Sequence, residues 1–368
     1  MEKIKLGDLC VPKKGQIKEE ADVIIDYIDI ASVDNESKKV TGFQTMSFGE
    51  APSRARKAVE KGDILISTVR PNLNAVAILE EDTPNISVAS TGFCILKCKD
   101  NVDNRFVFNF CKSKAFIKDM VSQATGASYP AVNDDIVRSA LIPNYSYEEQ
   151  CHISEILDGM SFTIEKRKVE LQALDELTKA RFVEMFGDPV ANNKGWKTKP
   201  LLDMGKCKNG MNFHYDDSGI EISCLGVGDF KDLSVIDNTK KLSIVSLNEM
   251  PSEEYLLKDG DIVFVRSNGN KDLVGRSLAI YPGNLPTTFS GFCIRYRIHD
   301  DEITVLYLLR VLKMESMRKK MAGRGANIQN LNQQILGTLV IPVPPIELQN
   351  QFADFVRAVD KSKFMQTL

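Results

Sequence analysis

The sequence lacks the motifs of several metal-binding and catalytic classes. Its eight cysteines are scattered, with no CxxC pair and no histidine at ligand spacing, so they are expected to be structural thiols rather than metal ligands or disulfides. The three histidines, His152, His214 and His299, stand alone, which disfavours a catalytic role. The GxxxxGK[ST] loop is absent, which excludes ATP-driven translocation as an activity of this chain.

Long apolar runs are also missing. No segment approaches the roughly 20 apolar residues of a membrane span, and the start, MEKIKLGDLC, lacks the apolar core of a signal peptide. We therefore expect a soluble, cytoplasmic protein without a membrane partner. The formal charge of −3 and pI of about 5.8 argue against non-specific coating of nucleic acid. DNA binding would have to come from local basic patches.

An internal repeat organises the chain. GDIL at Gly62–Leu65 returns as GDIV at Gly260–Val263, and TGFCI at Thr91–Ile95 returns as SGFCI at Ser290–Ile294. The second of these shifts is 199 residues (290 − 91). The same shift relates further residues: Gly126 to Gly325, Asn133 to Asn332, Ile142 to Ile341 and Gln150 to Gln349. The repeat is much longer than a solenoid unit of 20 to 50 residues. It predicts a duplicated globular domain.

Each copy begins with strand patterns and ends with helical ones. Short β-rich runs such as DILISTV are bounded by Gly, Pro, Asn and Asp. In FVFNFCKSKAFIKDMVSQ and its partner VLYLLRVLKMESMRKKMA, apolar residues recur at spacings of three and four, which predicts helices. A short helix capped by Asn133 is expected to follow in the first copy. The fold class is α+β, with two homologous mixed domains.

Between the copies, residues 147–186 hold one glycine and no proline and read as a single long helix that ends at the Gly187–Pro189 turn. Its narrow apolar stripe requires a partner helix, although packing on its own domain remains an alternative. The stripe lies near heptad positions: Leu157, Met160, Ile164, Leu171, Leu174 and Leu177.

The segments RFVEMFGDP (Arg181–Pro189), NNKGW (Asn192–Trp196) and IPVPPIELQNQF (Ile341–Phe352), with the repeated cores, resemble type I restriction-modification specificity subunits. The resemblance implies two target-recognition domains separated by two long helices that form an antiparallel coiled coil with pseudo-twofold symmetry. Each domain would read one half of a split double-stranded DNA target. The helices would act as a spacer and dock two adenine methyltransferase subunits, and restriction subunits would join through the complex.

In this interpretation, residues 1–146 and 187–346 are the two domains. Residues 147–186 form the long central helix, and residues 347–368 form a short C-terminal helix. The last helix is about half as long as the first, so either the natural chain is a shortened form or sequence is missing from its end. We expect its residues Phe352, Phe355, Val356 and Val359 to cover half of the first helix. The part near Leu171, Leu174 and Leu177 would then bind a methyltransferase subunit or a second copy of this chain.

No catalytic residue, metal or cofactor is expected. The DPPY-type loop and the Gly-rich loop of an amino-methyltransferase are absent, because the only double proline, at Val343–Ile346, lacks a preceding Asp or Asn. The pair Glu36 and Lys38 has no upstream Asp to complete a nuclease motif, and a solvated loop explains it better. The chain is therefore predicted to be non-catalytic.

Basic residues form two groups of candidate phosphate contacts, although each could be an ordinary solvated surface. The first comprises Arg54, Arg56, Lys57 and Lys61, and the second Arg310, Lys313, Arg318, Lys319, Lys320 and Arg324. Base contacts are expected from Arg, Asn, Gln and Ser side chains on loops, because these side chains can form hydrogen bonds with the edges of guanine and adenine. The candidates in the first copy are Arg70, Asn72, Asn74, Ser128 and Tyr129, and in the second Arg266, Asn268, Asn270, Lys271, Arg324, Asn327 and Gln329.

These loops differ between the copies while the cores agree, as expected for one scaffold that reads two half-sites. A duplicated protein-binding adaptor without DNA specificity would also keep its cores, and it remains the alternative. The basic, Asn-rich loops argue against the adaptor.

Overall fold

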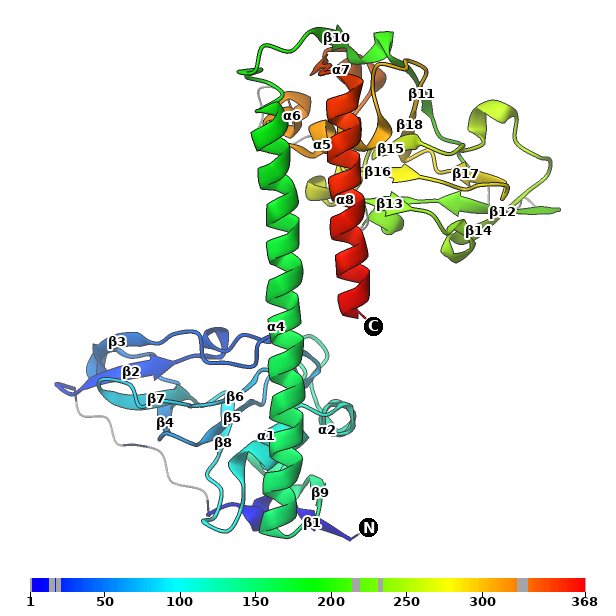
Figure 1. Ribbon diagram of the computed structural model, residues 1–368. Coiled ribbons are helices and arrows are strands. Elements are labelled where there is room, and N and C mark those ends of the chain that lie inside the picture. Colours follow the sequence, from blue (N-terminus) through cyan, green and yellow to red (C-terminus); the bar gives the residue numbers. More distant parts are fainter. Residues whose placement is uncertain are drawn as a thin grey trace. The chain divides into compact units, whose positions relative to one another are not determined.

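The computed structural model describes residues 2–12, 17, 21–213, 219–230, 234–322 and 330–367. It divides into two compact units, Met1–Lys166 and Arg167–Leu368, each described below by itself. The helix α4 (Tyr147–Phe186) begins in the first unit and ends in the second (Figure 1).

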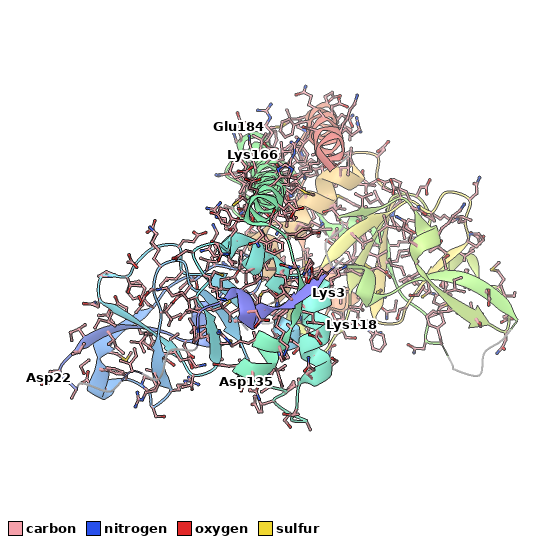
Figure 2. All side chains as sticks on the ribbon, turned by 90° about the horizontal axis from the view of Figure 1, so that it is seen from below. Lys3, Asp22, Lys118, Asp135, Lys166 and Glu184 are labelled. Carbon is pink, nitrogen blue, oxygen red and sulfur yellow. The ribbon has the colours of Figure 1, made fainter. Side chains whose placement is uncertain are left out.

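The first unit is a mixed α and β domain with three small sheets. Their strand orders are β3-β2-β7-β4, β6-β5-β8 and β1-β9. The strands are β1 (Lys3–Lys5), β2 (Ile24–Ile28), β3 (Gln44–Ser47), β4 (Ala55–Ala58), β5 (Ile64–Ser67), β6 (Val76–Ile78), β7 (Ile86–Ser90), β8 (Phe93–Leu96) and β9 (Leu141–Pro143). The helices that precede α4 are α1 (Asn104–Cys111), α2 (Lys114–Gln123) and α3 (Asp134–Ser139). Figure 2 shows Lys118 on α2 and Asp135 on α3.

Strand β5 divides the core of this unit in two. Ile64 and Ile66 pack with α1 and α2, whereas Leu65 between them packs with the residues on the other face. This alternation follows from the two-residue period of a strand. Both faces of β5 are therefore buried, as the continuous apolar run ILI requires.

The second unit repeats this plan on a larger sheet. Its strand orders are β11-β18-β15-β16-β13, β14-β12-β17 and β10-β19. The strands are β10 (Thr198–Pro200), β11 (Gly205–Asn209), β12 (Ile220–Leu225), β13 (Val235–Ile236), β14 (Ser243–Leu247), β15 (Asp261–Val265), β16 (Ser277–Ile280), β17 (Thr287–Phe289), β18 (Cys293–Ile298) and β19 (Val340–Pro342). The helices are α5 (Val305–Lys313), α6 (Glu315–Ala322), α7 (Gln333–Gly337) and α8 (Ile346–Thr367).

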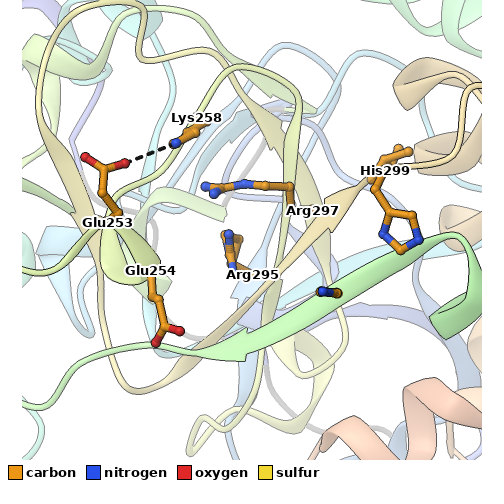
Figure 3. A pocket seen from close by; sticks show the side chains of 8 residues that line it. Glu253, Glu254, Lys258, Arg295, Arg297 and His299 are labelled. Carbon is orange, nitrogen blue, oxygen red and sulfur yellow. Dashed lines mark ion pairs between the residues drawn. The ribbon is translucent and has the colours of Figure 1, made fainter.

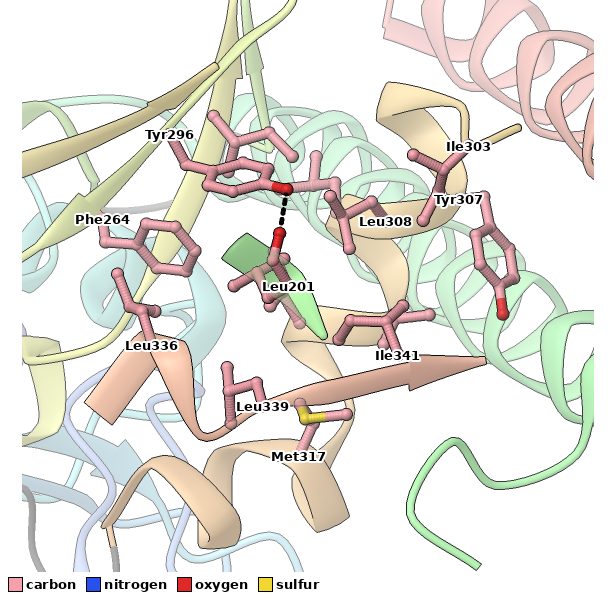
Figure 4. Close-up of a cluster of buried hydrophobic side chains, with 14 of the residues drawn as sticks. Leu201, Phe264, Tyr296, Ile303, Tyr307, Leu308, Met317, Leu336, Leu339 and Ile341 are labelled. Carbon is pink, nitrogen blue, oxygen red and sulfur yellow. Dashed lines mark hydrogen bonds between the residues drawn. The ribbon is translucent and has the colours of Figure 1, made fainter. Parts of the chain in front are cut away.

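The main core of the second unit lies between its sheet and its helices. Tyr296 of β18 is fully buried there, and its hydroxyl donates to the Leu201 carbonyl at 2.7 Å (Figure 4). Tyr307 of α5 likewise donates to the Pro342 carbonyl at 2.9 Å. Both phenols are thus buried with a hydrogen-bond partner, which avoids the cost of an unpaired polar group.

The two units share their strand pairing, which supports duplication. In each, one strand pairs antiparallel with one later strand and parallel with another further along the chain: β2 with β3 and β7, and β12 with β14 and β17. The caps of the short helices also correspond, because Asn133 accepts from the Ile136 amide at 2.9 Å and Asn332 from the Ile335 amide at 2.8 Å. The predicted Asn133 cap is confirmed.

The strand pairing departs from the sequence register by one residue in β8 and β18. Leu65 lies opposite Ile95 on β8, and its repeat counterpart Val263 lies opposite Arg295 on β18. The sequence shift of 199 would instead relate Arg295 to Leu96. Because a one-residue shift moves a side chain to the other face of a strand, the TGFCI and SGFCI motifs do not place matching residues in matching cores.

The helical patterns are confirmed, with a break inside each. In the first unit α1 ends at Cys111, and Ser113 caps α2 by accepting from the Phe116 amide at 3.2 Å. In the second unit α5 ends at Lys313 and α6 starts at Glu315. The Ser113 side chain satisfies a free amide at the start of α2. In both units the long pattern folds as two short helices.

The end of α4 packs antiparallel on α8. The Phe352 ring lies 5.3 Å from that of Phe182 and 5.7 Å from that of Phe186, in edge-to-face contacts. Further along α8, Lys363 pairs with Asp175 at 2.5 Å. Residues later in α8 therefore lie beside residues earlier in α4, so the two helices run antiparallel. This confirms the predicted antiparallel helix pair.

A buried glutamine attaches each long helix to its domain. Gln150 of α4 accepts from the Asp103 amide at 3.1 Å and donates to the Tyr145 carbonyl at 2.9 Å. Gln349 of α8 accepts from the Thr304 amide at 2.8 Å and donates to the carbonyls of Glu302 and Pro344, both at 2.8 Å. Asp103 and Thr304 are the N-caps of α1 and α5, so each glutamine binds the start of a domain helix.

Gln349→Leu is expected to lower the free energy of unfolding by about 2–4 kcal/mol, because three backbone groups lose a buried partner while the volume is kept. Denaturant unfolding of the full chain would measure the loss. Gln351→Leu on the exposed face of the same helix is the matched control and should change stability little. Equal stability of the two variants would contradict the anchoring role.

Candidate nucleic-acid interface

The two predicted base-contact loops of the first unit lie together. The Arg70 amide donates to the Pro130 carbonyl at 2.7 Å, and Val69 forms a β-bridge with Ala131. The Arg70 guanidinium also lies over the Tyr129 ring, 4.7 Å from its centroid. Two segments about sixty residues apart in the sequence thus form one surface that presents a cation and an aromatic ring.

The backbone of this surface is unusual. Arg70 has φ of 50° and Asn74 has φ of 49°, in the left-handed region that residues other than glycine seldom adopt. Between them Pro71–Leu73 forms a single turn of 3-10 helix. Strain of this kind concentrates at functional sites, where the surrounding structure holds it. Here the hydrogen bond from Arg70 to Pro130 contributes to that support.

Most predicted base contacts of this unit are accessible. Arg70, Asn72, Ser128 and Tyr129 are exposed, and Tyr129 keeps 67% of its surface open. Asn74 is the exception, because it is only 7% exposed and donates to the Cys111 carbonyl at 3.0 Å. Asn74 therefore holds the loop on α1, and its prediction as a base contact is wrong for this structure.

The basic group of the first unit is partly engaged within the fold. Lys57 donates to the Phe93 carbonyl at 2.6 Å and pairs with Asp134 at 2.8 Å, so it has a structural role rather than the predicted phosphate contact. Arg54 pairs with Asp29 at 2.9 Å but stays largely exposed. Arg56 lies over the Phe48 ring, and Lys61 is exposed. Arg54 and Lys61 remain the most accessible cations of the group.

In the second unit the equivalent loop follows β15. The Arg266 amide donates to the Phe292 carbonyl at 2.7 Å, and the Arg266 carbonyl accepts from Leu331 at 2.8 Å. The Asn268 and Asn270 side-chain oxygens each accept from a backbone amide two residues on, at 2.7 and 3.0 Å. These turns fix the loop backbone and leave the exposed Arg266 side chain at its start.

Phe292 is a candidate that sequence reasoning missed. It is 60% exposed, and its carbonyl binds the start of the Arg266 loop. The motif SGFCI suggests a core position, because its sequence counterpart Phe93 is fully buried. Only the one-residue offset of β18 brings Phe292 out of the core, so no signal in the sequence alone indicates it.

Several predicted contacts fall outside the described residues. Arg324, Asn327 and Gln329 belong to the range 323–329, and the side chain of Lys271 is also outside the description. They remain predictions.

A cationic cluster lies at the helices of the second unit. Lys313 donates to the Ser234 hydroxyl at 2.6 Å, and burial together with Arg310, Arg276 and Arg318 lowers the pKa of Lys313 to about 8. Burial also lowers the pKa of Arg310 and Arg318. Arg276 was absent from the sequence-based group. Clustered like charges of this kind favour an anion such as phosphate.

Lys319 and Lys320 extend this group on α6. Lys319 pairs with Glu315 at 2.6 Å in an exposed ion pair, which contributes little to stability. Lys320 is exposed. Both side chains can therefore reach a phosphate, whereas Arg318 donates to the Val274 carbonyl at 3.2 Å.

Lys313 makes folding depend on pH. Its folded pKa of about 8 lies below the ordinary value of 10.5, so the unfolded chain binds the proton more tightly between these values. The free energy of unfolding is therefore expected to rise as the pH increases from about 8 to 10.5. The contribution of Lys313 to this rise is up to about 3 kcal/mol. Unfolding measured across this range should lose that slope in Lys313→Met and keep it in the control Lys319→Met. The same slope in both variants would contradict the assignment.

The middle of α4 exposes apolar side chains. At 100° per residue, Ile156, Leu157, Met160 and Ile164 share one face, and Phe162 lies on the opposite face. Phe162 is the most open, at 72%. Of the predicted stripe, Leu157, Met160, Ile164 and Leu177 are exposed.

The remaining residues of the predicted partner surface are half-buried or buried. Leu171 and Leu174 are half-buried and Leu177 is 50% exposed, so the expectation that this part of α4 binds a partner stays a prediction. Phe352 and Val359 are buried and Phe355 is half-buried. These α8 residues serve the packing of their own chain. Among the described apolar side chains of α4, those of residues 160–169 reach the largest exposed fractions, whereas α8 extends at least to Asp175.

None of the helices in the described ranges combines the length and hydropathy that a membrane crossing requires. The same part of the chain holds no group of three or more His, Cys, Asp or Glu placed to bind a metal ion.

Comparison with known proteins identifies two repeats of one family model. The model for the type I restriction modification DNA specificity domain matches residues 1–174 and 193–368. The StySPI specificity subunit of a type I restriction enzyme from Salmonella potsdam is 26% identical over 290 residues, which cover 73% of this chain and 60% of that protein. The MjaVIII specificity subunit from Methanocaldococcus jannaschii is 23% identical over 283 residues, covering 70% and 64%. The chain thus spans less than two thirds of these relatives.

Solved structures share the fold. A chain from a study of complex assembly and conformational transition of the type I R-M system aligns with a TM-score of 0.59 at 21% identity, over all of this chain and 94% of that one. The S subunit of a type I restriction-modification system from M. genitalium aligns with a TM-score of 0.56 at 15% identity, over 100% and 91%.

Proposed function

Because the chain belongs to the type I restriction modification DNA specificity domain family, we propose that it is the DNA-recognition subunit of a type I restriction-modification complex. Residues 1–146 and 187–346 are its two target-recognition domains, and each reads one half of a bipartite target. Residues 147–186 and 347–368 are the helices that set the spacing. The complex acts in the cytoplasm on double-stranded DNA.

One observation supports base recognition most directly: corresponding loops of the two domains present an exposed arginine on a shared scaffold, beside a different aromatic residue in each domain. The loop after β5 presents Arg70 beside Tyr129, and the loop after β15 presents Arg266 beside Phe292. An arginine can bind guanine by two hydrogen bonds, and asparagine can bind adenine. The nearby cations position the backbone without reading sequence. An adaptor without DNA specificity would not need this arrangement.

The exposed faces of α4 support partner binding. Ile156, Met160 and Ile164 form one apolar face and Phe162 marks the other, so two partners could bind the same helix from opposite sides. We assign these faces to two methyltransferase subunits, with restriction subunits joining through them. Self-association through the same helix is the competing outcome.

The chain itself is proposed to be non-catalytic. A purified sample incubated with S-adenosylmethionine and duplex DNA is expected to transfer no methyl group, because the sequence lacks the donor-binding and adenine-binding loops of a methyltransferase. Adding the cognate methyltransferase subunit should produce methylation. Turnover by the chain alone would contradict the assignment.

Methylome sequencing tests the central proposal. Cells that express this chain with its cognate methyltransferase subunit should acquire adenine methylation at one split motif, and cells with the methyltransferase alone should not. Methylation independent of this chain, or at a continuous motif, would contradict two-domain recognition.

A further inference from the structure

A cavity of about 430 Å³ in the second unit lies at the edge of the main sheet. Strand β18 provides Arg295 and Arg297, Lys206 comes from β11, and Glu253 and Glu254 come from the turn before β15. Figure 3 shows the Arg295 side chain between Glu254 and Arg297 in this cavity. Its size is within the range of small-ligand pockets.

Arg295 is the unusual member of this group. It is only 6% exposed, and its Nε is buried without a hydrogen-bond partner among the described residues. No described carboxylate forms an ion pair with it, and burial together with Arg297 lowers its pKa. Asp261 and Glu254 oppose this shift by their charge, but they pair with Arg297 and Lys208 instead. A buried guanidinium without an ion-pair partner is costly to the fold. The cavity therefore contains an unsatisfied cation.

The nearby acidic groups are already engaged. Three ion pairs account for them: Glu253 with Lys258 at 3.1 Å, Glu254 with Lys208, and Asp261 with Arg297 at 2.7 Å. Asp261 receives two hydrogen bonds from Arg297, one on each carboxylate oxygen. Arg295 and the exposed Lys206 remain as cations without an ion pair in the described part of this pocket.

The fold does not require arginine at this position. In the first unit the residue with the same strand pairing is Ile95, which lies opposite Leu65 as Arg295 lies opposite Val263. Ile95 packs against apolar neighbours. One scaffold thus accepts an apolar side chain here, and only the second unit places a charge, which points to a ligand rather than to folding.

We propose that Arg295 and Lys206 bind a phosphate group in this cavity. A guanidinium can bind two phosphate oxygens in parallel, and a lysine at the rim adds a single charge. The phosphate could belong to a small phosphorylated molecule or to the DNA backbone, which share this chemistry. Such a site goes beyond base recognition by the Arg266 loop.

Thermal unfolding of the full chain in rising inorganic phosphate, against sodium chloride of equal ionic strength, tests the site. The wild type should show a saturable rise in unfolding temperature, and Arg295→Met should require at least tenfold more phosphate. Arg357→Met, which removes an exposed cation of the same unit, should behave as the wild type. Without phosphate, Arg295→Met should be no less stable, because it removes an unpaired buried charge. If it does not fold, Arg295→Lys replaces it, with weakened phosphate binding expected.

A duplex titration separates the two sources. If the phosphate comes from DNA, Arg295→Met should weaken binding of any sequence uniformly and reduce its salt dependence. If it comes from a small molecule, duplex binding should be unchanged while the phosphate effect is lost. No saturable phosphate effect, or an equal effect in wild type and Arg295→Met, would overturn the proposal.

Discussion

Replacing Met160 and Ile164 with aspartate is expected to abolish retention of the methyltransferase subunit by this chain, with affinity lowered about a hundredfold or more. Both residues are exposed, so the charge costs little in the free protein. At a dry interface each aspartate would be buried without a partner, which costs a few kcal/mol, and 1.4 kcal/mol corresponds to tenfold in affinity. Co-purification and calorimetry with the methyltransferase subunit measure the loss.

Two controls separate docking from folding. Gln172→Asp adds one negative charge at an exposed position of α4 and should leave assembly intact. Leu171→Asp alters a half-buried residue and should lower the unfolding temperature of the chain itself. Normal assembly of the Met160 and Ile164 double variant would show that this face is not an interface. Loss of a dimer in light scattering, without loss of methyltransferase binding, would assign the face to self-association.

The architecture could be predicted from the sequence because it depends on local patterns. The sequence predicts the long helix with the bounds that the structure has, 147–186, since an uninterrupted stretch without proline ends at a Gly-Asp-Pro turn. The Asn133 cap likewise follows from residue type and spacing, whereas the antiparallel helix pair is what the family resemblance implies. The long helix and the cap need only periodicity and the chemistry of helix ends.

The site was predicted less well, because side-chain accessibility depends on contacts distant in sequence. Asn74 and Lys57 have the residue types of DNA contacts, yet Cys111 and Asp134 hold them inside the fold. Phe292 and Arg295 depend on the offset of β18, which the near-identical motifs conceal. Which part of the α4 stripe is exposed likewise depends on how far α8 extends, and Lys363 of α8 reaches Asp175. Such details are set by strand register and packing rather than by local pattern.

Removal of the side chains of Arg266 and Asn268 should change one half of the DNA target only. A bidentate base contact contributes roughly 1–3 kcal/mol to discrimination, so Arg266→Ala with Asn268→Ala should relax or abolish recognition of that half by about 10- to 100-fold. The turn at Asn268 is also lost, and the effect should therefore exceed that of Arg266→Ala alone. Recognition of the other half-site should be unchanged.

The first unit provides the reciprocal test. Arg70→Ala with Asn72→Ala alters the exposed loop after β5 and should affect the opposite half-site by the same reasoning. Methylome sequencing of cells expressing each double variant with the methyltransferase subunit gives both results in one assay. Since each loop is held by contacts within its own unit, through Pro130 in the first and Phe292 in the second, the effects should not cross. If either variant changes both halves together, the two domains do not read DNA independently.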